Sequence, residues 1–214
     1  MRDYKNYLFD ADGTLIDTTE LIWHCFENTA RMTGHEPIGR DAALKHIGLT
    51  LRDQMSVHFG KLDDAAYERY RMIHMEYQMS VYTQYLKLFP GVLNTLDMLK
   101  KNGKKLAVVT SRFRNSLDIY LRDTGIYDFF DTIISPESTM HHKPNPEPAI
   151  KALEDLNARK SETIFIGDAT FDIECGVSAG IDTAFVKWSI NDTDSLKKKP
   201  TWFIDTMEEL VVWA

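Results

Sequence analysis

Short apolar runs alternate with helical patterns along most of the chain. A brief run without polar interruption is typical of a strand that a parallel sheet buries on both faces. The predicted strands cover residues 4–10, 106–109, 132–134, 163–166, 183–186 and 202–204. Apolar residues at helical spacing predict helices at 92–101, 114–124, 146–157, 170–179 and 207–213. This alternation predicts an α/β fold with a Rossmann-like parallel sheet and helices on both faces.

Residues 18–86 carry helical spacing only and show no strand pattern. Thr18 has the character of a helix N-cap, and Gly34 ends the first helix of this block. Further helices are predicted at 40–46, 51–59 and 63–82. Because the block interrupts the strand and helix alternation after the first strand, we predict an inserted helical domain. The predicted organisation is a core of residues 1–17 and 87–214 with a helical cap of residues 18–86.

Composition narrows the classes of partner. The chain has 214 residues and a formal net charge of -7, which suits one domain with an insert and argues against nucleic acid or an anionic membrane as partner. Cys25 and Cys175 lie far apart in helical patterns and are predicted to be buried thiols. No signal peptide or membrane-length apolar run is present, so we expect a cytoplasmic protein. The sequence leaves the oligomeric state open.

Two acids directly follow the first predicted strand. Asp10 and Asp12 are spaced two apart and precede Gly13. Ligands bind at the carboxyl ends of the strands in a parallel α/β sheet. Such carboxylates can hold a hard cation such as Mg2+, or one can attack phosphorus while the other donates a proton. A calcium-binding EF-hand is excluded because its later acid, glycine and glutamate are missing; a plain acidic turn stays the alternative.

Two further segments have the chemistry of an anion site. Thr110 and Ser111 follow a buried strand, where a hydroxyl and free amides can bind anion oxygens. Lys143 stands before a loop in which alternate prolines fix the backbone. A lysine held in this way, in an acidic protein, is a candidate phosphate clamp. The alternatives are an ordinary turn and a solvated charge.

The fourth segment again places an acid at the end of a strand. Asp168 follows the strand at 163–166, and Asp172 lies one helical turn further on. Gly176 and Gly180 are predicted to let the following helix pack closely on the sheet.

In chain order, these four segments resemble the four motifs of the haloacid dehalogenase-like (HAD) hydrolase superfamily. The matching segments are 10–14, Thr110 after its strand, 143–148 and 167–172. The helical block lies where this family carries its C1-type cap. The presence of Asp12 separates the chain from the true dehalogenases and the P-type ATPases, and points to hydrolysis of phosphate esters or anhydrides.

The resemblance implies a role for each motif residue. Asp10 would form an aspartyl-phosphate, and Asp12 would act as general acid and then as general base. Mg2+ would be held by Asp10, Asp168 and the backbone carbonyl of Asp12. The residues implied to bind the phosphoryl group are Thr110, Lys143, Ala11, Gly13 and Ser111. Asp172 would orient Lys143 or a metal-bound water.

The cap is implied to choose the substrate. Residues 44–52 resemble the cap specificity loop of phosphoglycolate phosphatases and related pyrophosphatases, and their alternative interpretation is a solvated helix face. Candidate contacts to an anionic leaving group are Lys45, His46 and Arg52, and Gly48 is a further candidate for binding the substrate. Segments 99–103, 124–126 and 186–190 also resemble the bacterial pyrophosphatase branch.

We therefore expect a Mg2+-dependent phosphatase of a small phosphorylated substrate, with phosphoglycolate and pyrophosphate ranked first. A sugar-phosphate phosphatase or a phosphomutase of the same family is the alternative. The phosphoglucomutase branch fits less well, because it carries Glu-Asp where this chain has Gly167 and Asp168. A receiver domain phosphorylated on Asp as a signal is further away, because that fold is shorter and has no helical insert.

Overall fold

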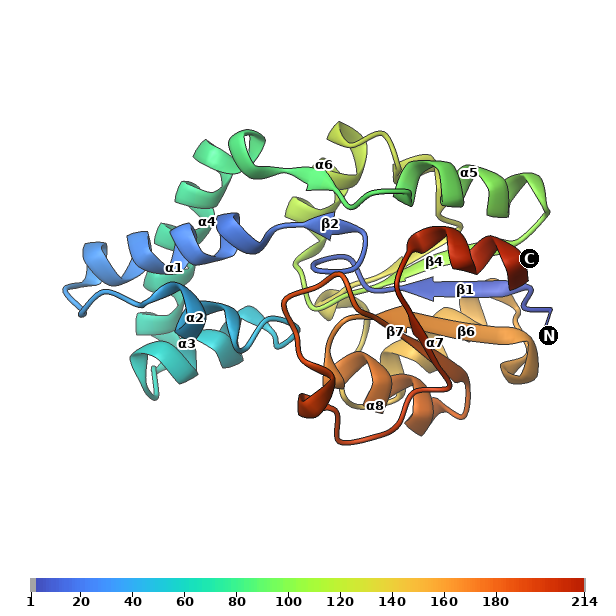
Figure 1. Ribbon diagram of the computed structural model, residues 1–214. Coiled ribbons are helices and arrows are strands. Elements are labelled where there is room, and N and C mark those ends of the chain that lie inside the picture. Colours follow the sequence, from blue (N-terminus) through green and yellow to red (C-terminus); the bar gives the residue numbers. More distant parts are fainter. Residues whose placement is uncertain (1–2, 214) are drawn as a thin grey trace.

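The computed structural model describes residues 3–213 and consists of two lobes (Figure 1). The larger lobe contains a six-stranded sheet of order β5-β4-β1-β6-β7-β8 in which every neighbouring pair is parallel. The strands are β1 Asn6–Phe9, β4 Lys105–Val109, β5 Thr132–Ile134, β6 Thr163–Gly167, β7 Asp182–Val186 and β8 Trp202–Ile204. The predicted α/β fold is confirmed, and the order of strands reverses between β1 and β6, where such sheets bind ligands.

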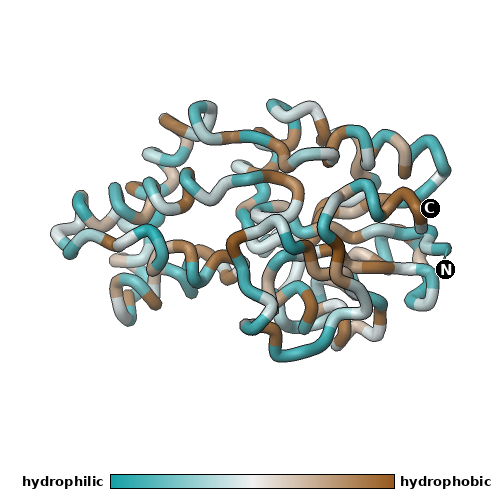
Figure 2. Tube along the Cα trace, in the orientation of Figure 1, coloured by the Kyte–Doolittle hydropathy of each residue, from teal (hydrophilic) through white to brown (hydrophobic). Residues whose placement is uncertain are grey.

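Helices cover both faces of this sheet. They are α5 Val92–Lys101, α6 Arg114–Asp123, α7 Glu147–Leu156 and α8 Thr170–Ala179. Successive residues of β1 point to opposite faces: Tyr7 and Phe9 pack with α5 and α6, whereas Leu8 packs with α7 and α8. Figure 2 shows the hydrophobic segments of the sheet enclosed between these helical layers. Cys25 and Cys175 are both free and buried, as predicted.

Short 3-10 helices complete the larger lobe. They are η1 Tyr127–Phe129, η2 Pro136–Ser138, η3 Lys160–Glu162, η4 Thr193–Ser195 and η5 Met207–Trp213. The closing helix was predicted at η5, but it takes the tighter 3-10 form. Met207 and Leu210 are both buried, and a spacing of three places them on one side of a helix with three residues per turn.

The smaller lobe is the predicted helical block. Its helices are α1 Thr19–Thr33, α2 Arg40–Leu44, α3 Leu51–Phe59 and α4 Asp64–Tyr85. They enclose a core of their own that includes Phe26, Met55 and Tyr70. Asp63 caps α4 by accepting a hydrogen bond from the Ala66 amide at 2.8 Å, and the helix runs three residues past its predicted end.

Two very short strands join the lobes, and the sequence analysis missed them. β2 Ile16–Asp17 and β3 Lys87–Leu88 pair antiparallel, and an ion pair of 3.0 Å links Asp17 to Lys87. Two residues are too few to show an alternating pattern, so only long-range pairing reveals these strands. They lie where the chain leaves the larger lobe and where it returns, next to the proposed domain boundaries.

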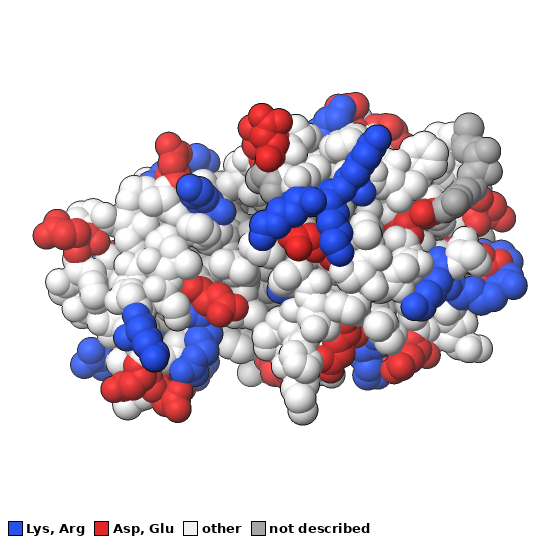
Figure 3. All heavy atoms as spheres, turned by 90° about the horizontal axis from the view of Figure 1, so that it is seen from below, with Lys and Arg blue, Asp and Glu red and all other residues white. Residues whose placement is uncertain are grey.

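The surface carries charges of both signs. Acidic and basic side chains are interspersed over the face shown in Figure 3. Among the helices within residues 3–213, none has both the length and the apolar character needed to cross a membrane.

Candidate active site

Three carboxylates meet at the carboxyl edge of the sheet. Asp10 follows β1, Asp168 follows β6, and Asp172 lies in the first turn of α8; each offers an oxygen within 4.8 Å of the others. Phe9 is in register with Ile166, so the residues that follow these two strands reach the same edge. All three acids are buried. Parallel strand pairing thus brings together acids from opposite ends of the larger lobe's sequence.

Lys143 lies inside this carboxylate cluster. Its Nζ donates to Asp10 Oδ1 at 2.6 Å, to Asp172 Oδ1 at 2.6 Å and to the carbonyl of Val109 at 3.2 Å. Burial alone disfavours the charged form of a lysine, but the charges of Asp10 and Asp172 outweigh it and raise the pKa of Lys143 above its usual value. Lys143 is therefore a fixed cation at the edge of β1.

Asp168 has polar partners that the sequence analysis did not anticipate. Ser189 Oγ donates to its Oδ2 at 2.6 Å, and Asn191 Nδ2 donates to the same oxygen at 2.8 Å. Burial nevertheless raises the pKa of Asp168 to about 7, and the charge of Asp172 adds to the effect. Burial likewise raises the pKa of Asp10 well above its usual value, against the charge of Lys143. A cation at the cluster would relieve this cost.

The donor set suits a hard divalent cation. Three buried carboxylates supply oxygen ligands of the kind that Mg2+ prefers. Gly13 keeps the space next to them open: it has φ +84°, and a Cβ built there would lie 2.3 Å from Asp168 Oδ2. Only glycine fits this position without displacing the carboxylate.

Asp12 lies outside the three-carboxylate cluster and has partners of its own. Its carboxylate accepts from Arg112 Nε at 2.8 Å, from Arg112 Nη2 at 2.7 Å and from Thr18 Oγ1 at 2.6 Å. Thr18 is the N-cap residue of α1, as predicted, but its side chain makes no capping hydrogen bond. It holds Asp12 instead.

Arg112 is the main site residue that sequence reasoning missed. Its side chain is only 8% exposed, and its guanidinium lies over the ring of Tyr120, 4.7 Å from the centroid. A single arginine in a turn carries no periodic signal, and its partner Asp12 is 100 positions away. The one available hint was its place two residues after Thr110.

Thr110 and Ser111 directly follow β4, and their hydroxyls make different contacts. Thr110 is buried at the cavity wall, where its Oγ1 accepts from the amide of Arg112 at 3.1 Å. Ser111 Oγ donates to the carbonyl of Gly48 at 2.7 Å, so its hydroxyl is engaged with the cap. Ala11 is fully buried in the loop after β1, and its carbonyl accepts from the amides of Leu15 and Ile16.

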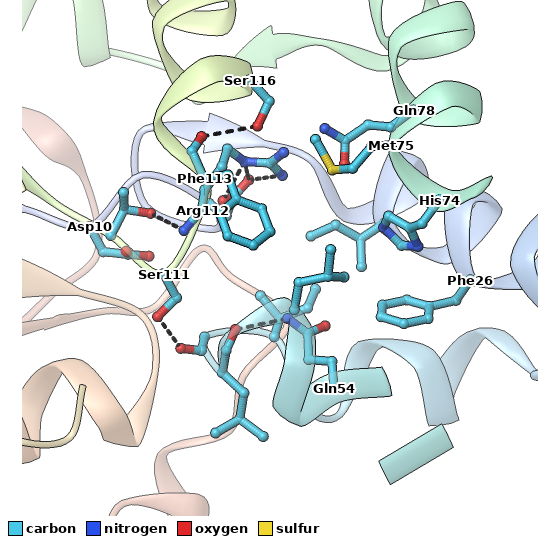
Figure 4. Close-up of a pocket in the computed structure, with 17 residues that line it drawn as sticks. Asp10, Phe26, Gln54, His74, Met75, Gln78, Ser111, Arg112, Phe113 and Ser116 are labelled. Carbon is cyan, nitrogen blue, oxygen red and sulfur yellow. Dashed lines mark hydrogen bonds and ion pairs between the residues drawn. The ribbon is translucent and has the colours of Figure 1, made fainter. Parts of the chain in front are cut away.

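A cavity separates the carboxylate edge from the cap (Figure 4). From the core it is lined by Asp10, Asp12, Thr110, Ser111, Arg112, Phe113 and Ser116. From the cap it is lined by Ile22, Phe26, Ile47, Gly48, Leu49, Leu51, Gln54, His74, Met75 and Gln78. The cap side is therefore apolar with a few uncharged polar groups, and among the described residues it holds no lysine or arginine.

Of the four predicted cap contacts, the structure places only Gly48 at this cavity. Lys45 is exposed, and the ring of His46 lies 6.0 Å from that of His58. Arg52 pairs with Asp64 at 2.5 Å and lies over the ring of Tyr67. The sequence could locate this loop but could not tell which of its side chains face the core.

A family model described as haloacid dehalogenase-like hydrolase matches residues 7–186. The chain belongs to the haloacid dehalogenase-like hydrolase family. The resemblance seen in the four motifs is thereby confirmed, and so is the prediction of a phosphate-hydrolysing enzyme.

Individual relatives of this HAD hydrolase cover nearly its whole length. The pyrophosphatase PpaX of Oceanobacillus iheyensis is 34% identical over 208 residues, which is 97% of this chain and 95% of that protein. A solved structure named as a HAD-like hydrolase from Bacteroides fragilis is 32% identical, covers 97% of this chain and 99% of its own, and has a TM-score of 0.89. A predicted phosphoglycolate phosphatase from Haemophilus somnus has the same fold, with a TM-score of 0.91, 21% identity and 100% of both chains covered.

Proposed function

We propose that this HAD hydrolase is a Mg2+-dependent phosphatase that works through an aspartyl-phosphate. The observation that carries the proposal is the position of Asp10, which follows the central strand with Lys143 bound to one carboxylate oxygen at 2.6 Å. A buried carboxylate held by a fixed cation is suited to attack an electron-poor phosphorus, because the cation balances the charge of the phosphoryl oxygens.

The proposed reaction has two steps. A carboxylate oxygen of Asp10 forms a bond to phosphorus while the bond to the leaving oxygen breaks, and Asp12 gives that oxygen its proton. Asp12 then takes a proton from water, whose oxygen attacks the same phosphorus and releases phosphate and the free carboxylate of Asp10. Lys143 and Thr110 hold the phosphoryl oxygens, and Asp172 keeps Lys143 in place through the hydrogen bond of 2.6 Å.

The carboxylate cluster is the proposed metal site. Asp10, Asp168 and the backbone carbonyl of Asp12 would hold Mg2+, which would supply positive charge to the phosphoryl oxygens. Ser189 and Asn191 fix the orientation of Asp168 through their hydrogen bonds, as residues behind a metal ligand do. Gly13 leaves room for the ligands beside Asp168.

Pyrophosphate and 2-phosphoglycolate are the first candidates as substrates. The pyrophosphatase PpaX relative matches this chain almost end to end, and the structural neighbour from Haemophilus somnus is named as a predicted phosphoglycolate phosphatase. Both compounds are small phosphorylated metabolites whose departing part is an anion.

The test is phosphate release with and without Mg2+ from a panel of phosphate compounds. The panel comprises pyrophosphate, 2-phosphoglycolate, p-nitrophenyl phosphate, hexose phosphates, nucleoside monophosphates and acetyl phosphate. Asp10→Asn should lower kcat by roughly a thousandfold or more, as loss of a covalent nucleophile does. Asp128→Asn, at an acid in η1 away from the cavity, is the matched control and should retain activity. An Asp10→Asn protein that turns over normally would refute the mechanism.

A further inference from the structure

The cap presents a buried amide to the cavity without giving it a partner. Gln78, on α4, is 4% exposed and lines the cavity. The hydroxyl of Tyr120 is close to its amide, but Nε2 makes no hydrogen bond of regular geometry among the described residues. Buried donors are normally paired. Figure 4 shows this amide and the guanidinium of Arg112 directed into the same part of the cavity. A ligand atom that accepts hydrogen bonds fits between them.

Arg112 is the one cationic side chain among the described residues that line this cavity. Its Nε and Nη2 donate to Asp12, and within residues 3–213 its Nη1 makes no hydrogen bond. His74 adds no charge, because burial, helped by the charge of Arg112, lowers its pKa to about 3. Among the described residues that line the cavity, Arg112 is therefore the one that can offer a positive charge to an anion.

The leaving group of the substrate enters the same cavity as Arg112. Asp10 and Thr110, which would hold the phosphoryl group, line this cavity together with Arg112 and Gln78. The part of the substrate that departs therefore lies on the side where these two residues can reach it.

We propose that the leaving group of the natural substrate is itself anionic and that Arg112 and Nε2 of Gln78 bind it. The inference rests on the proposed phosphatase function and narrows its substrate class. Gln54 also lines the cavity but is not part of this anion site. Its Nε2 donates to the carbonyl of Leu49 at 2.9 Å, and the atom left without a partner is its Oε1, which would repel an anion.

The experiment compares substrates that differ mainly in the charge of the leaving group. 2-Phosphoglycolate is matched with 2-hydroxyethyl phosphate. Pyrophosphate is matched with its P1,P1-dimethyl ester, which keeps the anhydride bond and carries no charge on the leaving phosphate. We expect kcat/KM of the wild type to favour the charged member of at least one pair by about a hundredfold, because two hydrogen bonds to a charged group are lost with the neutral one. The pair that shows the preference identifies a carboxylate or a phosphate as the preferred group.

Variants assign this preference to residues. Arg112→Met should reduce the ratio of charged to neutral kcat/KM about tenfold or more, and Gln78→Leu should reduce it about fivefold, mainly through KM. Arg112→Lys keeps the charge and should restore part of the ratio. Arg114→Met is the control, because Arg114 pairs with Asp118 at 2.7 Å and does not line the cavity; its ratio should equal that of the wild type.

The outcomes separate this inference from the function on which it rests. Equal wild-type activity on both members of both pairs, or variants that slow both members equally, would overturn the anion site while leaving a phosphatase. Calorimetry of 2-phosphoglycolate and 2-hydroxyethyl phosphate binding to the Asp10→Asn protein gives a readout without turnover. Preferential binding of 2-phosphoglycolate that Arg112→Met removes would support the site even if the wild type released no phosphate, a result that would refute the phosphatase.

Discussion

At the scale of single residues, the nearest charged groups decide whether a buried ionisable side chain is charged or neutral. Lys143 stays charged because two carboxylates each lie 2.6 Å from its Nζ. His74 is equally buried, but its ring nitrogen meets only the hydroxyl of Thr29 at 3.3 Å among the described residues, and the nearby Arg112 repels a proton. Burial therefore keeps one residue a cation and the other neutral, depending on the partner.

The neutral state of His74 predicts an acid-sensitive fold. In the unfolded chain this histidine binds a proton near pH 6.5, whereas in the folded protein its pKa falls to about 3. Lowering the pH through 6.5 therefore stabilises the unfolded state, and this residue should cost about 2 kcal/mol of stability at pH 5 relative to pH 7.

Urea unfolding at pH 7 and pH 5 measures this contribution. His74→Gln removes the titrating group. The free energy of unfolding of this variant should therefore fall less between pH 7 and pH 5 than that of the wild type, by about 2 kcal/mol. If both proteins lose the same stability, His74 does not account for the acid sensitivity.

At the scale of elements, helix α8 contains one glycine and ends at a second, and the two have different roles. Gly176 lies against β7, where a Cβ would come 2.4 Å from Thr183 Cγ2. Gly180 has φ +78° and ends α8. A Cβ built there would lie 3.8 Å from the side chain of Lys160, so there is space at this position. The predicted close packing therefore holds for Gly176, but Gly180 serves as the C-cap.

Gly176→Ala should destabilise the protein although alanine favours helices. The methyl group would force α8 or β7 to move, which typically costs about 1–3 kcal/mol, against a gain of about 1 kcal/mol in helix propensity. We expect a net loss of up to about 2 kcal/mol in urea unfolding. Val177→Ala, at the exposed neighbouring position, is the control and should lose less. A stabilised Gly176→Ala protein would show that the helix has room to shift.

At the scale of the whole molecule, the two lobes close over buried charges that do not balance. Four acids surround the site, namely Asp10, Asp12, Asp168 and Asp172, and among the described residues only Lys143 and Arg112 oppose them there. The excess of negative charge is a stability cost in a low-dielectric interior. Binding of a divalent cation should therefore stabilise the folded protein as a whole.

Mg2+ should raise the melting temperature. At a concentration of about one hundred times Kd, binding contributes about 2.7 kcal/mol, which corresponds to roughly 5–10 °C for a chain of this size. Asp168→Asn should abolish most of this shift, because it removes a carboxylate ligand. Differential scanning fluorimetry with MgCl2 and with NaCl at equal ionic strength separates binding from screening. The same Mg2+ shift in both proteins would place the cation elsewhere.

Local patterns in the sequence were sufficient to predict most elements and the acids at their ends. Apolar runs located β1, β4 and β6, and parallel strands carry their carboxyl ends to one edge. For that reason the pattern of strands alone predicts that Asp10, Thr110 and Asp168 lie at the same edge of the sheet. Helical spacing also located the inserted block, because hydrophobic periodicity depends only on near neighbours.

Tertiary structure alone decided which polar groups became partners. Nothing local links Arg112 to Asp12, Ser111 to Gly48, or Gln78 to the cavity, and the rotation of α3 that turns Arg52 toward Asp64 follows from how the cap packs. Periodicity specifies that a face is buried, but not what lies opposite it. Hydrogen bonds and ion pairs act over a few ångströms, so their partners are fixed only when distant segments of the chain are brought together.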